Sequence, residues 1–331
     1  MEIDDYTLIK LIAKTPFGEV YLGLKKGSAK IYALKNIKTK YLKNPTKLHL
    51  LMIASHFKAF KYFENEISIL KDVNHPNILK MIVVKQALED VYIITEYFNE
   101  GTLEEYLEKY IKEKNKAFSE EIVQYIMKQV IDAIKYLHNK KIMHRDLNLS
   151  NILINYENEN DRENWNIMKG KIKIIDFGFS RYLKKGELAK SILGSPFFMS
   201  PILLNKINKS EGYNDTEYDE KEDIWSLGII CYELLVGKNP FDSDRMNELL
   251  GKVNKGIYYI PATLSKEAIS FLNCMIKSNP KQRLNIDNLY NHPFLNKNVK
   301  EFNKIDIDEL KNKIIINNSK ILIDSKNNED F

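Results

Sequence analysis

Two stretches of the sequence carry carboxylate and amide side chains at spacings suited to phosphoryl transfer. They are the run His144-Arg145-Asp146-Leu147-Asn148-Leu149-Ser150-Asn151 and the triplet Asp176-Phe177-Gly178. Phosphoryl transfer needs a metal ion held against the phosphates, a cation on the phosphates and a carboxylate near the incoming hydroxyl. Asp146 can accept a hydrogen bond from that hydroxyl and later take its proton. Asn151 and Asp176 offer the oxygen ligands that Mg²⁺ prefers.

A cation for the phosphates is available upstream, at Lys35 in the stretch Tyr32-Ala33-Leu34-Lys35. A lysine on a strand is usually a solvated edge charge. Here a helical pattern follows and carries Glu66, which would hold Lys35 on the α- and β-phosphates by forming an ion pair. Glu64 is a rival partner for Lys35. The order in which these residues occur argues against a coincidence.

The first part of the chain is expected to form a sheet with one helix. β-forming residues alternate with turn residues, and the expected strands are residues 6–13, 19–24, 30–37, 77–85 and 91–97. Between the third and fourth strands, residues 58–73 carry apolar side chains at helical spacing, and the pattern stops before His75-Pro76.

From Ser119 onward the pattern is mainly helical. Ser119 is a good N-cap and is followed by two glutamates, which favour a helix start. Further helices are expected at residues 222–236, 244–255, 265–276 and 286–290. Insertions are expected at about 40–57, 156–169 and 205–218, the last two as Asn- and acid-rich loops, and residues 296–331 form an Asn/Lys-rich tail.

Composition is typical of a globular protein: 331 residues, 44% hydrophobic, 29% charged, with a net charge of +5. The basic residues are scattered and no basic arm is present, so nucleic acid is not an expected partner. Cys231 and Cys274 lie in apolar patterns and are expected to be buried thiols. The N-terminus has no apolar signal region, residue 2 is not glycine, and no apolar run reaches the roughly 18 residues of a membrane span. A cytoplasmic location is therefore expected.

Over residues 6–295, the chain resembles the eukaryotic protein kinase superfamily. The resemblance rests on the residues above and on Gly194 to Pro201, Asp223-Ile224-Trp225-Ser226-Leu227-Gly228, Asn239-Pro240-Phe241, Arg283 and His292-Pro293-Phe294. It implies an α+β fold with two lobes. Residues 1–98 would form a small antiparallel sheet lobe with one main helix, and residues 99–295 a larger, mainly helical lobe.

The resemblance also implies ATP and Mg²⁺ as cofactors and protein molecules as substrates. The catalytic residues would be Lys35, Glu66, Asp146, Asn151 and Asp176, with Asn151 and Asp176 on the metal. The nucleotide would contact Ile12, Ala13, Gly18, Val20, Ala33, Lys35, Thr95, Glu96, Phe98, Leu153 and Asp176. Thr95 would be the gatekeeper, and Leu70, Met81, His144 and Phe177 would stack as the regulatory spine. Asp223 would brace the catalytic-loop backbone.

Ser195 indicates serine/threonine specificity, because it occupies the place of the hydroxyl residue that contacts the catalytic aspartate in that branch. The residues after Asp176 and around Ser195 resemble the autophagy-initiating ULK kinases, and Ser191 would then be an activating phosphorylation site. An ordinary exposed serine is the plain interpretation of Ser191. Calcium/calmodulin-type and NIMA-related kinases are the competing subfamilies.

Three positions depart from the family pattern. The glycine-rich loop keeps only Gly18, which should hold the loop away from the phosphates. Asn148 replaces a lysine that stabilises the transferred phosphoryl group. Ile202 replaces the glutamate that pairs with Arg283, so Arg283 needs another partner: Glu222, a backbone carbonyl or solvent.

The leading hypothesis is an active serine/threonine kinase. The alternative is a pseudokinase that binds nucleotide weakly and acts as a scaffold or allosteric partner, which the altered positions favour. Regulatory partners would bind through the insertions or the tail.

Overall fold

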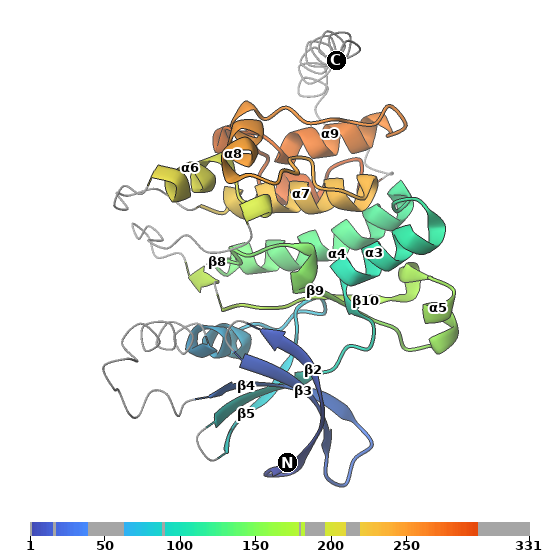
Figure 1. Cartoon of the computed structure of the whole chain (residues 1–331), viewed down its shortest axis with the longest axis vertical. Coiled ribbons are helices and arrows are strands. Elements are labelled where there is room, and N and C mark those ends of the chain that lie inside the picture. Colours follow the sequence, from blue (N-terminus) through green and yellow to red (C-terminus); the bar gives the residue numbers. More distant parts are fainter. Residues whose placement is uncertain are drawn as a thin grey trace.

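The structure is a computed structural model that describes residues 2–15, 18–38, 63–87, 90–178, 180–182, 196–209 and 219–296. Figure 1 shows two lobes, one built on a β-sheet and the other mainly on helices. The expected α+β fold is therefore confirmed. The expected insertion 40–57 and the tail from residue 297 lie outside the described residues.

The N-terminal sheet is antiparallel and has the order β1-β2-β3-β4-β6-β5. Its strands are β1 (Glu2–Ile3), β2 (Tyr6–Thr15), β3 (Gly18–Lys25), β4 (Ile31–Lys38), β5 (Met81–Ala87) and β6 (Asp90–Glu96). Residues 63–72 are helical, within the expected 58–73. Strand β1 was not expected from the sequence, because two residues are too few to show an alternating pattern.

One face of this sheet is closed by its own hydrophobic cluster. Its fully buried members are Ile3, Tyr6, Tyr32, Leu34, Tyr92 and Ile94. Tyr6 meets Tyr32 edge to face, with ring centroids 5.5 Å apart. Because side chains alternate between the faces of a strand, the residues that alternate with these buried ones along each strand face the opposite side of the sheet. The candidate active site lies on that side.

Gly18 is required by the packing of the sheet itself. A Cβ at this position would lie 1.8 Å from the backbone oxygen of Asn36 on the neighbouring strand, which no side chain can tolerate. The glycine thus allows the close approach of β3 and β4. Its presence is explained without reference to a phosphate.

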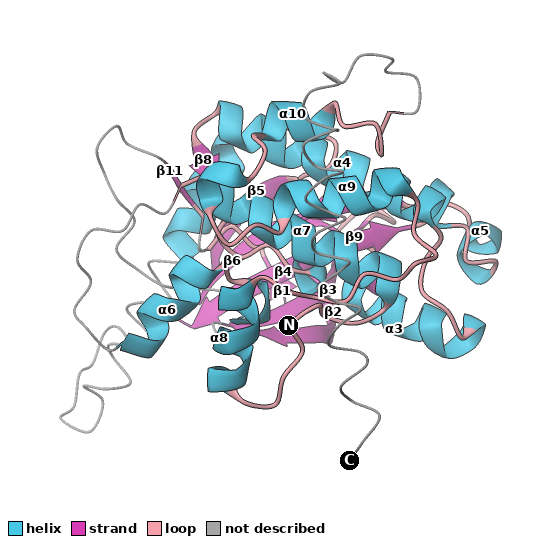
Figure 2. Ribbon diagram, turned by 90° about the horizontal axis from the view of Figure 1, so that it is seen from above, coloured by secondary structure: helices cyan, strands magenta, loops and turns pink. Residues whose placement is uncertain are grey.

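The larger lobe is assembled around a central buried helix. Its α-helices are α3 (Leu103–Lys114), α4 (Glu120–Asn139), α5 (Glu159–Glu163), α6 (Pro201–Lys209), α7 (Lys221–Val236), α8 (Met246–Lys255), α9 (Lys266–Met275) and α10 (Ile286–Tyr290). Helix α7 is apolar on nearly all sides, as a helix inside a core must be. Seen from above, it runs among the other helices of this lobe (Figure 2). Trp225 of α7 stacks on Phe241 with ring centroids 5.7 Å apart.

Three helices, α3, α5 and α6, were not expected from the sequence. Helix α3 begins with a capping box, in which Thr102 accepts from the Glu105 N–H and Glu105 accepts from the Thr102 N–H. This Thr-x-x-Glu spacing is a sequence signal that was overlooked. Helix α6 includes residues 205–209, which were expected to belong to an insertion, while residues 210–218 lie outside the described part.

The segment 156–169 is folded, although its composition suggested a loop. It contains α5 and the 3-10 helix η3 (Ile167–Lys169), and Trp165 packs against Tyr106 and Tyr110 of α3, with ring centroids 5.1 and 5.8 Å apart. Aromatic burial outweighs the polar composition of the segment here.

Two further expectations concern the cysteines and membrane insertion. Cys231 and Cys274 are both buried, as expected. Among the helices that the structure describes, none is both long and apolar enough to cross a membrane.

Candidate active site

A buried carboxylate fixes the backbone of the loop that carries Asp146. Asp223 of α7 accepts hydrogen bonds from the His144 and Arg145 N–H groups at 3.0 and 2.9 Å, and its carboxylate lies 2.8 Å from His138 Nε2. Burial alone would raise the pKa of Asp223, but His138 and the backbone donors outweigh it and lower that pKa. Arg145 has a φ of 73°, an uncommon conformation that this bracing sustains. The expected bracing role of Asp223 agrees with these contacts.

Asp146 lies between β8 (Ile142–Met143) and the 3-10 turn η2 (Leu149–Asn151), and it is in direct contact with Asn151 of that turn. The Asn151 amide donates to the Asp146 carboxylate Oδ2 at 3.0 Å and to the Asp146 backbone oxygen at 2.8 Å. These bonds direct the amide nitrogen of Asn151 toward Asp146. The amide oxygen is the atom with which Asn151 would bind a cation.

Asp176 follows the strand β10 (Lys171–Ile174) and has a φ of 63°. Its Oδ1 accepts from the Gly178 N–H at 3.2 Å. The next residue, Phe177, is completely buried and meets His144 edge to face at 5.1 Å. Phe177 belongs to the main core with Leu70, and Met81 packs against that core, so the four expected spine residues adjoin one continuous core.

Lys35 and Glu66 form a nearly buried ion pair. Lys35 Nζ lies 2.7 Å from Glu66 Oε2, with side chains 20% and 6% exposed. Desolvation opposes the charge of Lys35, but the carboxylates of Glu66 and Asp176 prevail and raise its pKa, so Lys35 stays cationic. Burial raises the pKa of Glu66. The rival Glu64 is exposed, so the structure selects Glu66.

Asn65 connects the helical residues 63–72 to the segment after Asp176. Its amide donates to the backbone oxygens of Phe177, Gly178 and Ser180 at 3.1, 3.1 and 2.5 Å. Sequence reasoning missed this residue. The signal in the sequence was its position: Asn65 is a polar residue directly before Glu66, on the helix that the expected ion pair between Glu66 and Lys35 already places near the site.

The open face of the N-terminal sheet gathers five of the expected nucleotide-contacting side chains. Strand pairing places Ala13 opposite Val20, Val20 opposite Lys35, and Ala33 opposite Thr95. Directly opposed residues share a face, as do residues two apart in one strand, so all five lie on one face. Val20 and Ala33 are only partly buried, which leaves apolar surface on this face.

The other expected nucleotide contacts lie between the two lobes or elsewhere on the sheet, apart from these five residues. Glu96 ends β6, where its backbone oxygen accepts from the Thr95 hydroxyl at 3.1 Å and retains a second lone pair. Phe98 follows and is buried. Leu153 lies on β9 (Ile152–Asn155), paired with Lys173 and Thr102. Ile12 is exposed on β2.

The side chains present fit a magnesium–nucleotide complex. Asp176 and Asn151 supply oxygen donors, and Lys35 supplies a cation whose pKa the charges of Glu66 and Asp176 raise. Hard oxygen donors beside a fixed cation are the chemistry that Mg²⁺ and phosphates require. Ser191 and Ser195 lie outside the described residues.

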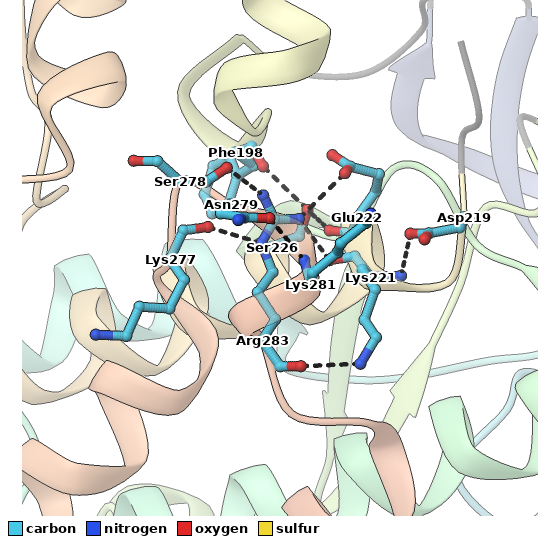
Figure 3. Close-up of polar contacts among 10 residues, drawn as sticks. All are labelled: Phe198, Asp219, Lys221, Glu222, Ser226, Lys277, Ser278, Asn279, Lys281 and Arg283. Carbon is cyan, nitrogen blue, oxygen red and sulfur yellow. Dashed lines mark hydrogen bonds and ion pairs between the residues drawn. The ribbon is translucent and has the colours of Figure 1, made fainter. Parts of the chain in front are cut away.

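Arg283 is bonded to other groups in place of a glutamate at position 202, where this chain has Ile202. Figure 3 shows the contacts around Arg283. Its guanidinium bonds to Glu222 Oε1 at 3.1 Å and to the backbone oxygens of Lys221 and Lys277, each at 2.8 Å. Both charged side chains are almost fully buried, at 0% and 3% exposure. The hypothesis of a substitute partner is therefore confirmed, and two of the three proposed alternatives contribute.

The same helix supports the end of the segment before Pro201. Ser226 of α7 donates to the Phe198 backbone oxygen at 3.0 Å (Figure 3). Phe198 belongs to the 3-10 turn η4 (Pro196–Phe198). Glu222 and Ser226 are one turn apart on α7, so the ion pair and this contact form one anchoring region.

Comparisons with known proteins agree with this geometry. A family model described as the protein kinase domain matches residues 6–295. The chain is 34% identical over 309 residues to the probable serine/threonine-protein kinase MARK-C of Dictyostelium discoideum, which covers 92% of the chain and 35% of that protein. It is 32% identical over 294 residues to serine/threonine-protein kinase 36 of Mus musculus, covering 88% of the chain and 19% of the relative. With serine/threonine-protein kinase TIO of Arabidopsis thaliana it shares 32% over 302 residues, 91% of the chain and 20% of that protein. The chain thus spans at most about a third of the length of these curated relatives.

Proposed function

We infer the function of this chain from its family, since it belongs to the eukaryotic protein kinase superfamily, serine/threonine type. We propose that it transfers the γ-phosphate of ATP to serine or threonine hydroxyls of proteins. The observation that carries the proposal is the Lys35–Glu66 ion pair at 2.7 Å. A cation held in this way, beside Asp176, is ready to receive phosphate oxygens.

In the proposed reaction, each side chain acts at a stated place. Asp146 accepts a hydrogen bond from the substrate hydroxyl, orients it, and takes its proton. Lys35 binds the α- and β-phosphates, and Glu66 keeps it in place. Asn151 and Asp176 would hold Mg²⁺, which when bound neutralises charge that develops on the phosphates.

The adenine ring would lie on the open face of the sheet. Val20 and Ala33 provide apolar contact from the sheet, and Leu153 provides it from the larger lobe. The backbone of Glu96 and Phe98 would bond the ring edge, and Thr95 would limit access behind it. The exposed side chains Ile12 and Ala13 would then close over the nucleotide from β2.

The proposed activity is tested by ATP transfer. Wild type, Asp146→Asn and Asp176→Ala are incubated with Mg²⁺ and ATP labelled on the γ-phosphate, together with a mixture of peptides containing serine, threonine or tyrosine. We expect wild type to label serine or threonine peptides, and both variants to lose at least about 10²-fold in rate. Equal incorporation in all three proteins would contradict kinase activity and favour the scaffold.

The finer assignments remain proposals that the same preparation can address. We propose Ser195 as the residue that selects serine and threonine, and Ser191 as a phosphorylation site that resembles the ULK arrangement. Mass spectrometry of protein incubated with ATP, compared with Asp146→Asn, would detect phosphate on Ser191. A cytoplasmic location is also proposed, and imaging of the tagged chain would test it.

A further inference from the structure

Asn148 occupies the place where the family usually has a lysine, and its side chain is built into the catalytic loop. It is only 6% exposed. Its oxygen Oδ1 accepts from the Ser150 hydroxyl at 2.6 Å and from the Asn151 N–H at 3.0 Å. Its nitrogen Nδ2 lies 3.3 Å from both Oδ1 and the backbone oxygen of Asp146.

The orientation of the Asn148 amide follows from the chemistry of its neighbours. The Asn151 backbone N–H can only donate, so the amide oxygen must face it. The amide nitrogen is then directed at Asp146, which offers a carboxylate and a carbonyl oxygen, both acceptors. A rotated amide would place two acceptors against each other on one side and two donors on the other.

The carboxylate of Asp146 is consequently held from both sides. Asn148 donates to Oδ1 at 3.3 Å and Asn151 donates to Oδ2 at 3.0 Å. Two donors on different oxygens oppose rotation of the carboxylate about its bond to Cβ. A single donor on one oxygen would restrict the rotation of the carboxylate less than two donors do.

We propose that Asn148 is a positioning residue, which aims the Asp146 carboxylate at the substrate hydroxyl. This role rests on the proposed kinase function. It also revises the meaning of the substitution: the side chain that replaces lysine supports the base in place of binding the transferred phosphoryl group. Misplacing a catalytic group by about 1 Å can cost about 10²-fold in rate.

The two halves of the amide allow the positioning role to be separated from a structural one. Asn148 is also the N-cap of η2, through Oδ1. Serine is an equally good N-cap and keeps that acceptor, but it is too short to donate to Asp146 as well. Asn148→Asp keeps the shape and the acceptor and removes both amide protons. Asn285→Ser is the matched control, because Asn285 is the exposed N-cap of α10 and accepts from the Asn288 N–H at 2.8 Å.

The test measures kcat, the KM for ATP and thermal stability for the full chain and these variants, using a serine/threonine peptide that wild type labels. We expect Asn148→Ser to lower kcat by about 10-fold to 100-fold, with the KM for ATP and the melting temperature unchanged. Asn148→Asp is expected to lower kcat at least as much, because it adds a like charge next to Asp146. Asn285→Ser is expected to retain the wild-type kcat.

Each outcome has a distinct meaning. A wild-type kcat in both Asn148 variants overturns the positioning role while leaving the kinase function in place. An increased KM for ATP at constant kcat also overturns it, because the residue would then act on the nucleotide. Wild-type incorporation no higher than that of Asp146→Asn overturns the proposed function, and this inference with it.

Discussion

Replacing Glu222 with alanine is expected to lower the free energy of unfolding by about 3 kcal/mol. The change removes the carboxylate from a buried pair and leaves the Arg283 guanidinium inside the protein. The Arg283 side chain is 0% exposed, so bulk water does not contact it in the folded wild-type protein. Breaking one side of such a pair typically costs about 3–5 kcal/mol.

The structure argues for the lower end of that range. Arg283 keeps its bonds to the backbone oxygens of Lys221 and Lys277, and its Cζ remains 5.1 Å from the centre of the Trp225 ring. These contacts would still stabilise part of the charge of the Arg283 guanidinium after the carboxylate is removed. Burial raises the pKa of Glu222 against the opposing pull of Arg283. The carboxylate is therefore itself costly to bury, which further reduces the net loss.

Urea denaturation followed by tryptophan fluorescence measures this loss. Glu222→Gln keeps an acceptor for Arg283 without the charge, and we expect it to lose less, about 1–2 kcal/mol. The matched control is Glu248→Ala, because Glu248 forms an exposed ion pair with Lys252 at 2.8 Å and should cost at most about 0.5 kcal/mol. A Glu222→Ala loss no larger than that of the control would refute the reasoning, because the backbone oxygens alone would then stabilise Arg283.

Three further changes test other parts of the structure. Burial raises the pKa of Glu233 to about 7, so the folded protein holds a proton there that the unfolded chain releases at lower pH. The free energy of unfolding should therefore fall as the pH rises from about 4.5 to 7. Glu233→Gln should be more stable than wild type at pH 8 and nearly equal to it at pH 4, and an equal effect at both pH values would contradict the raised pKa. Thr102→Ala removes the capping box of α3 and should lower stability by about 1 kcal/mol in urea denaturation, whereas Thr102→Ser should lose much less. Asn65→Ala should speed amide hydrogen exchange in residues 63–72, because three bonds to the segment after Asp176 are lost, and unchanged exchange would show that the Lys35–Glu66 pair alone holds this helix.

The sequence predicted most of the fold because the long elements have strong periodic patterns. Helix α10 was expected at its observed bounds, and Ser119 and Ser265 are the observed N-caps of α4 and α9. Short elements have no such signal, which explains the missed strand β1. Helix α5 and its surroundings were missed because their composition is polar, and only a few scattered side chains, Tyr156, Trp165 and Ile167, pack the segment against the core.

The candidate site was predictable where chemistry dictates residue types, and less so where geometry decides. The types and order of Asp146, Asn151 and Asp176 carry their own chemical meaning. The choice of Glu66 over Glu64 depends on which helix face meets the sheet, which the sequence left open. Asn148 was interpreted only as the loss of a lysine, because its contacts with Asp146 depend on the folding of the loop backbone.

The contacts of Asn65 have a consequence for the design of inhibitors. Compounds that need Phe177 displaced from the core must separate the backbone at Phe177 and Gly178 from the Asn65 amide. They must also expose a ring that is completely buried. Both costs reduce the affinity of such compounds, whereas ligands that leave Phe177 in place meet neither. The present arrangement therefore favours compounds confined to the open face of the sheet, and Asn65→Ala should narrow the difference in affinity between the two classes.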